Sequence, residues 1–116
     1  MSTPVTTETV VVLTTVGSAA EAATLARTLV DERLAACVNV LPEMASWYRW
    51  EGAVHEGQER LLVIKTTRRL LEPLQTRVHA LHPYDLPEFL VLPVSGGSSA
   101  YLQWIVESCR APESEG

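Results

Sequence analysis

The chain has 116 residues, an apolar fraction of 47%, a formal charge of −5 and an estimated isoelectric point of about 5.1. These values are typical of one soluble globular domain that buries a core without disulfides or metals. The acidic balance and the scattered arginines argue against nucleic acid as a partner, because phosphate contacts need a basic face.

The N-terminus lacks a basic segment followed by an apolar one, and the longest apolar runs are too short to cross a bilayer. We therefore expect no targeting segment and no membrane partner. Cys37 and Cys109 lie 72 positions apart without a CxxC motif, which is typical of thiols in a reducing compartment. We interpret both as small core side chains and predict a cytoplasmic protein.

Residues 1–7 and 111–116 are small, polar and proline-bearing, so we expect flexible tails around a single domain at 8–110. The domain begins with a β-branched run at 9–16, which predicts a strand covered on both faces. Next, Ser18-Ala-Ala-Glu21 matches a capping box, and the apolar side chains after it repeat at three- and four-residue steps. This pattern predicts a helix that runs to about Arg33.

The next two apolar stretches, 35–41 and 45–50, predict strand structure interrupted at Pro42, which cannot donate to a ladder. Glu51-Gly52 predicts a tight turn, after which 53–67 returns as a third strand. Each arm of this hairpin runs about 15 residues, or roughly 50 Å at about 3.3 Å per residue. A domain of about 100 residues is roughly 35 Å across, so a straight hairpin must project from it.

Residues 68–81 predict a second helix with Pro73 in its first turn, and 89–94 predict a fourth strand. A Gly-Gly-Ser-Ser loop at 96–99 leads to a closing helix at 101–109. The order strand, helix, strand, strand, helix, strand predicts an α+β, ferredoxin-like sandwich with an extended central hairpin and a C-terminal helix. Two helices then cover one sheet face, and the other face stays open unless something covers it.

The tip of the long hairpin carries Trp47, Tyr48 and Trp50 around Arg49. Each aromatic side chain can bury about 150–250 Å², and aromatics at a projecting edge are typical of an oligomer interface. We predict that these four residues form the interface of a homo-oligomer. The alternative is a hairpin that bends at Pro42 and packs its aromatics on its own sheet.

The segment HPYDLPE, His82 to Glu88, concentrates side chains that bind metals or move protons. The following prolines make His82 and Leu86 extended, and six extended steps span up to about 20 Å. A metal held by both His82 and Glu88 therefore needs further ligands from elsewhere. In the structural alternative, His82 ends the second helix, where a cation suits the helix dipole, Tyr84 packs, and Glu88 caps or pairs with a cation.

Several other residues have both a functional and a structural interpretation. Lys65, the single lysine, either pairs with Glu88 or an anion, or snorkels at the end of its strand. His79 and His82, three positions apart on a helix, form a surface metal pair or are simply exposed. Gly96-Gly97-Ser98-Ser99 either cradles an anion at a helix N-terminus or acts as a loop and cap. The chain has no recognisable nucleophile, phosphate-loop or zinc-protease motif, so we predict no enzymatic activity.

Five stretches together resemble the CutA family of divalent-cation tolerance proteins: LAACVNVLP at 34–42, SWYRWEG at 46–52, IKTT at 64–67, HPYDLPE at 82–88 and YLQW at 101–104. The match runs from about Val10 to Arg110. The resemblance implies a homotrimer in which long hairpins pack around a three-fold axis, with an architecture related to the trimeric PII signalling proteins. It also implies an association with tolerance to copper and other divalent metals.

Residues and resemblance together predict a cytoplasmic homotrimer that binds copper or another divalent cation, or a small ligand, in clefts between subunits, with no metal needed for folding. The residues we expect at this site are His82 and Glu88 on the metal, and Lys65, Tyr84, Tyr48 and Trp50 lining the cleft. Some family members have a proposed copper-binding cysteine where this chain has Thr14, and a hydroxyl is a poor copper ligand.

The alternative is a PII-like signalling module. Its clefts would bind an anionic metabolite or a nucleotide through Lys65, the arginines and the 96–98 loop. An unidentified partner protein would then read the state of the trimer.

Overall fold

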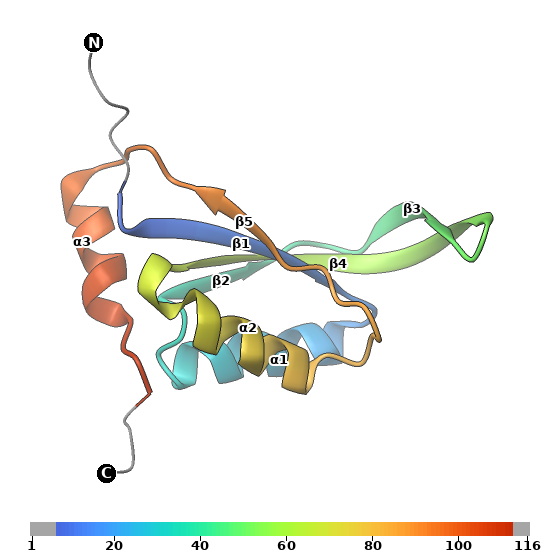
Figure 1. Cartoon of the computed structure of the whole chain (residues 1–116), viewed down its shortest axis with the longest axis horizontal. Coiled ribbons are helices and arrows are strands. Elements are labelled where there is room, and N and C mark those ends of the chain that lie inside the picture. The colour runs from blue at the N-terminus through green and yellow to red at the C-terminus, as the bar shows by residue number, and fades with distance from the viewer. Residues whose placement is uncertain (1–6, 113–116) are drawn as a thin grey trace.

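The computed structural model describes residues 7–112 (Figure 1). Its elements in chain order are β1 (Thr9–Val16), α1 (Ala19–Asp31), β2 (Cys37–Val40), β3 (Met44–Trp50), β4 (Ala53–Thr67), the 3-10 turn η1 (Arg68–Leu70), α2 (Leu71–Leu81), β5 (Leu90–Pro93) and α3 (Ser99–Ser108). None of the helices in this described range is long and apolar enough to cross a membrane. Most of the two predicted tails lies outside the described residues, but Thr7 donates its hydroxyl to the carbonyl of Val94 at 2.6 Å.

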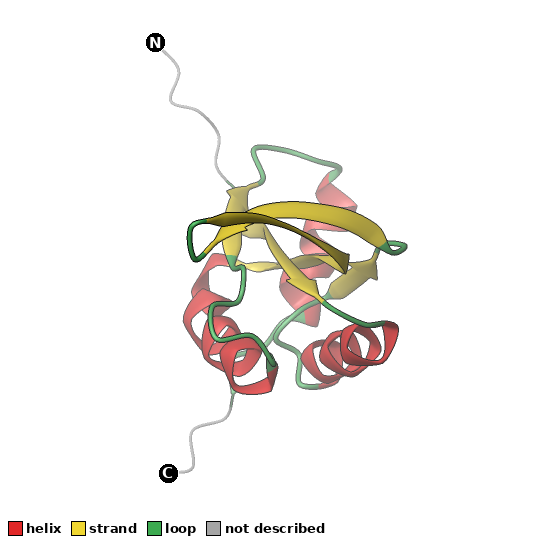
Figure 2. Ribbon diagram, turned by 90° about the vertical axis from the view of Figure 1, so that its right-hand side faces the viewer, coloured by secondary structure: helices red, strands yellow, loops and turns green. Residues whose placement is uncertain are grey.

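The strands form one antiparallel sheet in the order β2-β4-β1-β5, and β3 pairs with the outer half of β4. Both α1 and α2 lie on the same face of this sheet, while α3 lies at the end remote from the projecting hairpin (Figures 1 and 2). This arrangement confirms the α+β, ferredoxin-like fold that the order of elements predicted.

The core lies between the helix-covered sheet face and the two helices. Side chains alternate between the faces of a strand, so every second residue of β1 and of the inner half of β4 points toward α1 and α2. The largest buried members of this core are Val12, Val16, Leu62 and Ile64 from the sheet, and Leu25, Leu29, Leu74 and Val78 from the helices. Burying each such side chain stabilises the fold by about 1.5–3 kcal/mol. Because this burial selects the elements, the spacing of apolar residues in the sequence predicted their positions correctly.

The two ends of α1 follow from local hydrogen bonding. At the start, the Ser18 hydroxyl oxygen accepts from the Glu21 N–H at 3.1 Å, as the capping motif predicted. The same hydroxyl donates to the Glu21 carboxylate at 2.8 Å. The helix ends at Asp31, and Arg33 follows with a left-handed φ of 62°. At α3, Ser98 acts in the same way as Ser18, because its hydroxyl accepts from the Tyr101 N–H at 3.2 Å.

The hairpin projects from the domain, as its length predicted. Its turn, Glu51-Gly52, has φ values of 49° and 79°, which suit a two-residue hairpin turn. The Cα radius of gyration is 15.5 Å and the longest extent is 45 Å, whereas a compact domain of this size has a radius of gyration of about 13 Å. The alternative, in which the aromatics pack on their own sheet, is wrong within one chain because Trp47 is 69% exposed.

Pro42 produces a bulge rather than a sharp bend. Val40 pairs with Leu62, and Met44 pairs with Glu59. The four residue steps from Val40 to Met44 therefore lie opposite only three steps on β4, from Leu62 to Glu59. One extra residue on the edge strand increases the local twist, and Pro42 is tolerated there because its missing N–H breaks no ladder bond.

The sheet face opposite α1 and α2 is apolar. By strand alternation it presents Val11, Leu13, Leu61, Val63, Leu90 and Leu92. The first four are partly exposed and the two on β5 are exposed. In Figure 2 the two foreground helices lie below the sheet, so this face is the one left open. An open apolar face of this kind marks an interaction surface.

Candidate functional site

His82 closes α2 and is built into the fold. Its backbone is extended, with φ −81° and ψ 134°, as the following proline predicted. Its ring is buried: Nε2 lies 2.7 Å from the Thr15 carbonyl, and Nδ1 accepts from the Tyr84 N–H at 3.2 Å. With Nδ1 accepting from a backbone N–H, Nε2 is the nitrogen that donates to the Thr15 carbonyl. Both nitrogens are therefore occupied, and the geometry favours the structural interpretation over a metal ligand.

Of the two interpretations of His79 and His82, the surface metal pair is not formed. His79 is exposed and meets the edge of the Phe89 ring, with centroids 6.2 Å apart. His82 points instead to the end of β1. The two rings thus serve separate contacts.

Tyr84 turns back from the loop onto β4. Its hydroxyl donates to Glu59 Oε2 at 3.0 Å. A Cβ at Gly17 would lie 3.3 Å from the Tyr84 hydroxyl oxygen, so the glycine leaves room for the phenol. Burial, the hydrogen bond to Glu59 and the charges of Glu59 and Glu21 raise the pKa of Tyr84 to about 12. The phenol is therefore protonated at neutral pH and acts as a donor.

Glu88, at the end of the same loop, is a second neighbour of Glu59. Burial and then the charge of Glu59 raise the pKa of Glu88 above its ordinary value. Tyr48 reaches the cluster from β3. Its ring lies over Gly57, where an added Cβ would be 3.5 Å from it. Tyr48 is also one of the groups that raise the pKa of Tyr84. We call Glu59, Tyr84, Glu88, Tyr48 and Glu21 the Glu59 cluster.

The Glu59 cluster contains three of the six residues predicted for the site: Tyr48, Tyr84 and Glu88. Sequence reasoning missed Glu59 and Glu21. Glu59 sits in the polar stretch before the apolar part of β4, and Glu21 is explained as part of a helix cap. Neither position carries a local signal of function, because each acquires its neighbours only from the tertiary fold.

Lys65 lies elsewhere. It is six residues along β4 from Glu59, about 20 Å of extended chain. Its Nζ donates to the Tyr101 hydroxyl at 3.3 Å and lies 5.6 Å from the centre of that ring. The predicted partnership of Lys65 with Glu88 is therefore wrong within one chain. Trp50, at the hairpin tip, is equally far from Glu59 in the opposite direction along the ribbon.

The sulfur positions correct one prediction and confirm another. Cys37 is only half buried, on the open face of the sheet, with Sγ 3.8 Å from Asn39 Oδ1. Its assignment to the core was therefore wrong. Cys109 is buried, and burial raises the pKa of its thiol. Thr14 is buried in the core, and no hydrogen-bond partner for its Oγ1 is present among the residues described.

No group of three or more His, Cys, Asp or Glu side chains within 7–112 is placed to hold a metal ion. The carboxylates of the Glu59 cluster therefore do not form such a group within one chain. Its carboxylate and phenol oxygens suit cations that prefer oxygen ligands, whereas copper prefers sulfur and imidazole.

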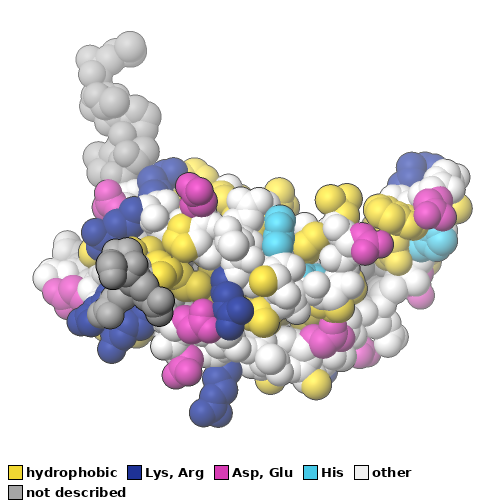
Figure 3. All heavy atoms as spheres, turned by 60° about the horizontal axis from the view of Figure 1, so that its bottom comes forward, with side chains coloured by type: hydrophobic (Ala, Val, Ile, Leu, Met, Phe, Trp, Pro, Cys, Tyr) yellow, Lys and Arg dark blue, Asp and Glu magenta, His cyan; other side chains and the backbone are white. Residues whose placement is uncertain are grey.

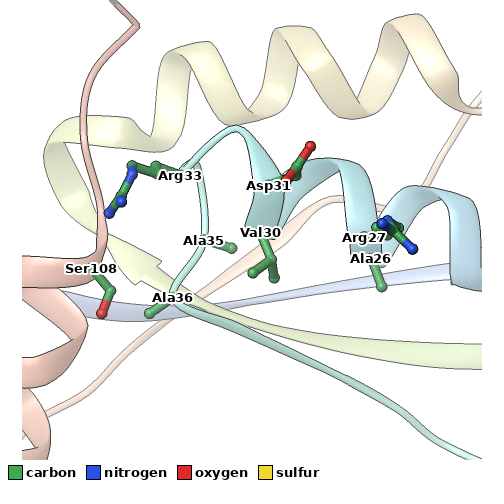
Figure 4. Close-up of a pocket in the computed structure, with 8 residues that line it drawn as sticks. All are labelled: Ala26, Arg27, Val30, Asp31, Arg33, Ala35, Ala36 and Ser108. Carbon is green, nitrogen blue, oxygen red and sulfur yellow. The ribbon is translucent and has the colours of Figure 1, made fainter.

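A groove of about 610 Å³ lies between the end of α1 and α3 (Figure 4). Alanine and valine side chains form its floor, with Arg33 and Ser108 at one end and Arg27 at the other, while Asp31 points away. It contains none of the residues predicted from sequence.

Comparison with known proteins identifies the group to which this chain belongs. The sequence model of the family described as CutA1 divalent ion tolerance protein matches residues 10–108. The chain belongs to the CutA1 family. The resemblance seen in the sequence motifs is thereby confirmed, and so is membership of a divalent-cation tolerance family.

The similarity to individual CutA1 proteins is extensive. The divalent-cation tolerance protein CutA of Thermus thermophilus is 52% identical over 98 residues, 84% of this chain and 95% of that one. Its solved structure has a TM-score of 0.86 at 50% identity, covering 88% of this chain and 99% of that one. The crystal structure of CutA1 from Oryza sativa gives a TM-score of 0.87 at 44% identity, covering 90% and 96%.

Two further relatives bear on cellular location. The Arabidopsis thaliana protein named CutA, chloroplastic, is 48% identical over 101 residues. The matched region covers 87% of this chain and 56% of the Arabidopsis protein. The Archaeoglobus fulgidus structure is titled a periplasmic divalent cation tolerance protein and has a TM-score of 0.83 at 30% identity, covering 86% of this chain and 97% of that one. The CutA1 family therefore occupies more than one compartment.

We predict that His82→Ala destabilises the protein without any metal being involved. The variant leaves the Thr15 carbonyl and the Tyr84 N–H without their partner, which costs about 1–3 kcal/mol. Urea unfolding in EDTA at fixed protein concentration measures the loss. The exposed control His79→Ala should change the free energy of unfolding by less than about 0.5 kcal/mol. Equal small effects of both variants would contradict the structural role.

We predict that Glu88→Gln makes stability less dependent on pH. The pKa of Glu88 is raised on folding, so the native state binds more protons, and the stability it contributes is lost as pH rises from about 4.5 through the folded pKa. The variant should therefore gain stability over the parent as pH rises. Urea midpoints at pH 4, 5.5 and 7 test this, with Glu72→Gln on the exposed side of α2 as control. A gain that grows toward low pH would refute the prediction.

Proposed function

We propose that this CutA1-family protein acts by binding, without catalysis, as a cytoplasmic homotrimer that takes up a divalent cation or a small ligand at clefts between subunits. The family's association with divalent-cation tolerance supports the choice of cation. The observation that carries the proposal is the hydrogen bond from the Tyr84 hydroxyl to Glu59 at 3.0 Å, beside a partly buried Glu88 whose pKa the charge of Glu59 raises.

The Glu59 cluster favours a cation for electrostatic reasons. Glu59 raises the pKa of the partly buried Glu88, so the two carboxylates repel each other when both are ionised. A divalent cation near both would replace that repulsion with attraction. The Tyr84 hydroxyl, already donating to Glu59, orients that carboxylate.

A second copy is needed to complete the site. One chain supplies too few ligands within the range described, and Tyr48 comes from a hairpin that projects beyond its own domain. The open apolar sheet face, together with the exposed aromatics of the hairpin, offers the contact area for association. Homotrimers of this kind would place the clefts beside the Glu59 cluster.

The cytoplasmic location rests on the chemistry of the thiols. Cys37 and Cys109 are both free and lie in different environments, one on the open face and one buried. Free thiols suit a reducing compartment. The acidic charge of −5 supports neither a nucleic-acid partner nor a basic membrane-binding surface.

We predict that Glu59→Gln and Glu88→Gln each weaken binding of a divalent cation at least tenfold. Each variant removes one carboxylate charge from the cluster and keeps its shape. Isothermal titration with Mn²⁺, Zn²⁺ and Cu²⁺ at pH 7 gives the affinities, with Glu72→Gln as the matched control. Unchanged affinity in both cluster variants would refute the assignment of the site, whatever the oligomeric state.

We also predict a mass near three times 12.7 kDa by light scattering at micromolar concentration. The open face and the projecting hairpin would otherwise leave large apolar side chains in water. A monomeric mass would show that the chain tolerates this exposure alone and would remove the inter-subunit cleft.

A further inference from the structure

The groove between the end of α1 and α3 has an apolar floor and cationic ends. Its volume of about 610 Å³ is that of a small-molecule site, since such sites measure roughly 300–1,000 Å³. Ala26, Val30 and Ala35 belong to the floor, while Arg33 stands at one end and Arg27 at the other (Figure 4). The groove therefore presents an uncharged middle between two positive charges.

The carboxylates next to these arginines in the sequence do not neutralise them. Asp31 lies four positions after Arg27, which is the spacing of a helical ion pair, yet it points away from the groove (Figure 4). Glu32 precedes Arg33, but Arg77 of α2 holds it by two hydrogen bonds, from Nη2 at 2.7 Å and from Nε at 2.9 Å. Within residues 7–112 this is the ion pair that is present, so neither groove arginine has a carboxylate partner there.

Arg33 adopts a backbone conformation that usually belongs to glycine. Its φ of 62° is left-handed, directly after the end of α1, where glycine avoids the steric cost that a Cβ imposes. Its N–H donates to the Val30 carbonyl at 3.1 Å, and its carbonyl accepts from the Arg110 N–H at 2.9 Å. Glycine would serve this turn better, so the presence of arginine indicates a function for its side chain.

Positive charge gathers at this end of an acidic chain. The net charge is −5, but Figure 3 shows Lys and Arg side chains mainly over the half of the molecule that carries α3, away from the projecting hairpin. Burial raises the pKa of Cys109, which follows the groove residue Ser108, and the charge of Arg69 acts against this rise. A further arginine thus lies close to this end, and the local field attracts anions.

The spacing of the two arginines sets the length of the ligand. The chain between them stays close to helical, because the Glu32 N–H donates to the Thr28 carbonyl and the Arg33 N–H to that of Val30. Six residues at about 1.5 Å each place Arg27 and Arg33 about 9 Å apart along the axis. Each guanidinium fits one planar carboxylate by two parallel hydrogen bonds. Extended suberate, a linear eight-carbon dicarboxylate, spans roughly 9 Å between its carboxyl carbons, given carbon–carbon bonds of about 1.5 Å.

We propose that this groove binds a linear dicarboxylate, with one carboxylate on Arg27, the other on Arg33 and the hydrocarbon chain on the apolar floor. The Ser108 hydroxyl stands at the Arg33 end and can donate to the second carboxylate. The site is separate from the Glu59 cluster, because that cluster includes Glu21 in the first turn of α1 and the groove lies at the other end of the helix. It requires neither the cation nor the trimer of the proposed function.

An NMR titration of the full ¹⁵N-labelled chain with suberate tests the site. Ordinary ligand efficiency places the Kd of a ligand with about twelve non-hydrogen atoms on the order of 1 mM. Suberate should shift the amide signals of residues 26–36 and of Ser108, and it should leave those of Glu59 and Glu88 unchanged. Succinate is too short to reach both arginines and octanoate has one carboxylate, so each should bind at least fivefold more weakly at the same ionic strength.

Arg33→Gly separates binding from folding. Glycine suits the left-handed φ, so this variant should keep or raise the midpoint of urea unfolding. It should nevertheless weaken suberate binding at least fivefold, and Arg27→Gln should do the same. Arg68→Gln is the matched control, because Arg68 is exposed and does not line the groove. Its affinity for suberate should equal that of the parent.

The outcomes distinguish a built site from general attraction of anions. Weaker binding in both groove variants, with unchanged binding in Arg68→Gln, supports the proposal. Equal shifts with suberate, octanoate and sulfate at one ionic strength overturn it, and so does unchanged affinity in both groove variants. Absence of suberate binding by the parent well above the expected Kd overturns it as well. The cation affinities of Glu59→Gln and Glu88→Gln test the proposed function independently.

Discussion

The structure depends on the strand β4, which builds the core with one half and the projecting hairpin with the other. The inner half of β4 pairs with β1 on one side and β2 on the other, so its side chains reach the core. The outer half pairs with β3 alone and continues past the end of the domain. A 15-residue strand is about as long as the whole molecule, so this chain has no surface of its own to cover the ribbon. The exposure of the aromatic side chains on the hairpin follows from this.

The Glu59 cluster forms at the junction between these halves. Glu59 and Met44 are the innermost pair of the projecting ribbon, just beyond the bulge at Pro42. The loop after α2 wraps the end of β1 there, held by the hydrogen bonds of His82. Gly17 faces the Tyr84 hydroxyl and Gly57 faces the Tyr48 ring, so close approach is possible on both sides. The cluster therefore forms where the loop after α2 meets the base of the projecting hairpin.

The helices and strands were predictable because the spacing of apolar residues and the capping and turn residues reflect local interactions. The β-branched run, the capping serines and the turn at Glu51 fall where the structure has them. Side-chain roles were harder to predict. His82 had a structural and a metal-binding interpretation, and the choice depended on the carbonyl of Thr15, 67 positions away. Cys37 looked like a core residue by composition, yet strand alternation places it on the uncovered face.

The fold class, the projecting hairpin and the family can be predicted from the sequence, because they depend on apolar spacing, strand length and motif order. Which polar groups meet depends on the folded structure. It placed Glu59 beside Tyr84 and Glu88, and it separated Lys65 from them by about 20 Å along β4. The reason is physical: periodicity encodes which face a residue occupies, whereas the register between distant strands and loops sets its neighbours, and that register is fixed when the core packs.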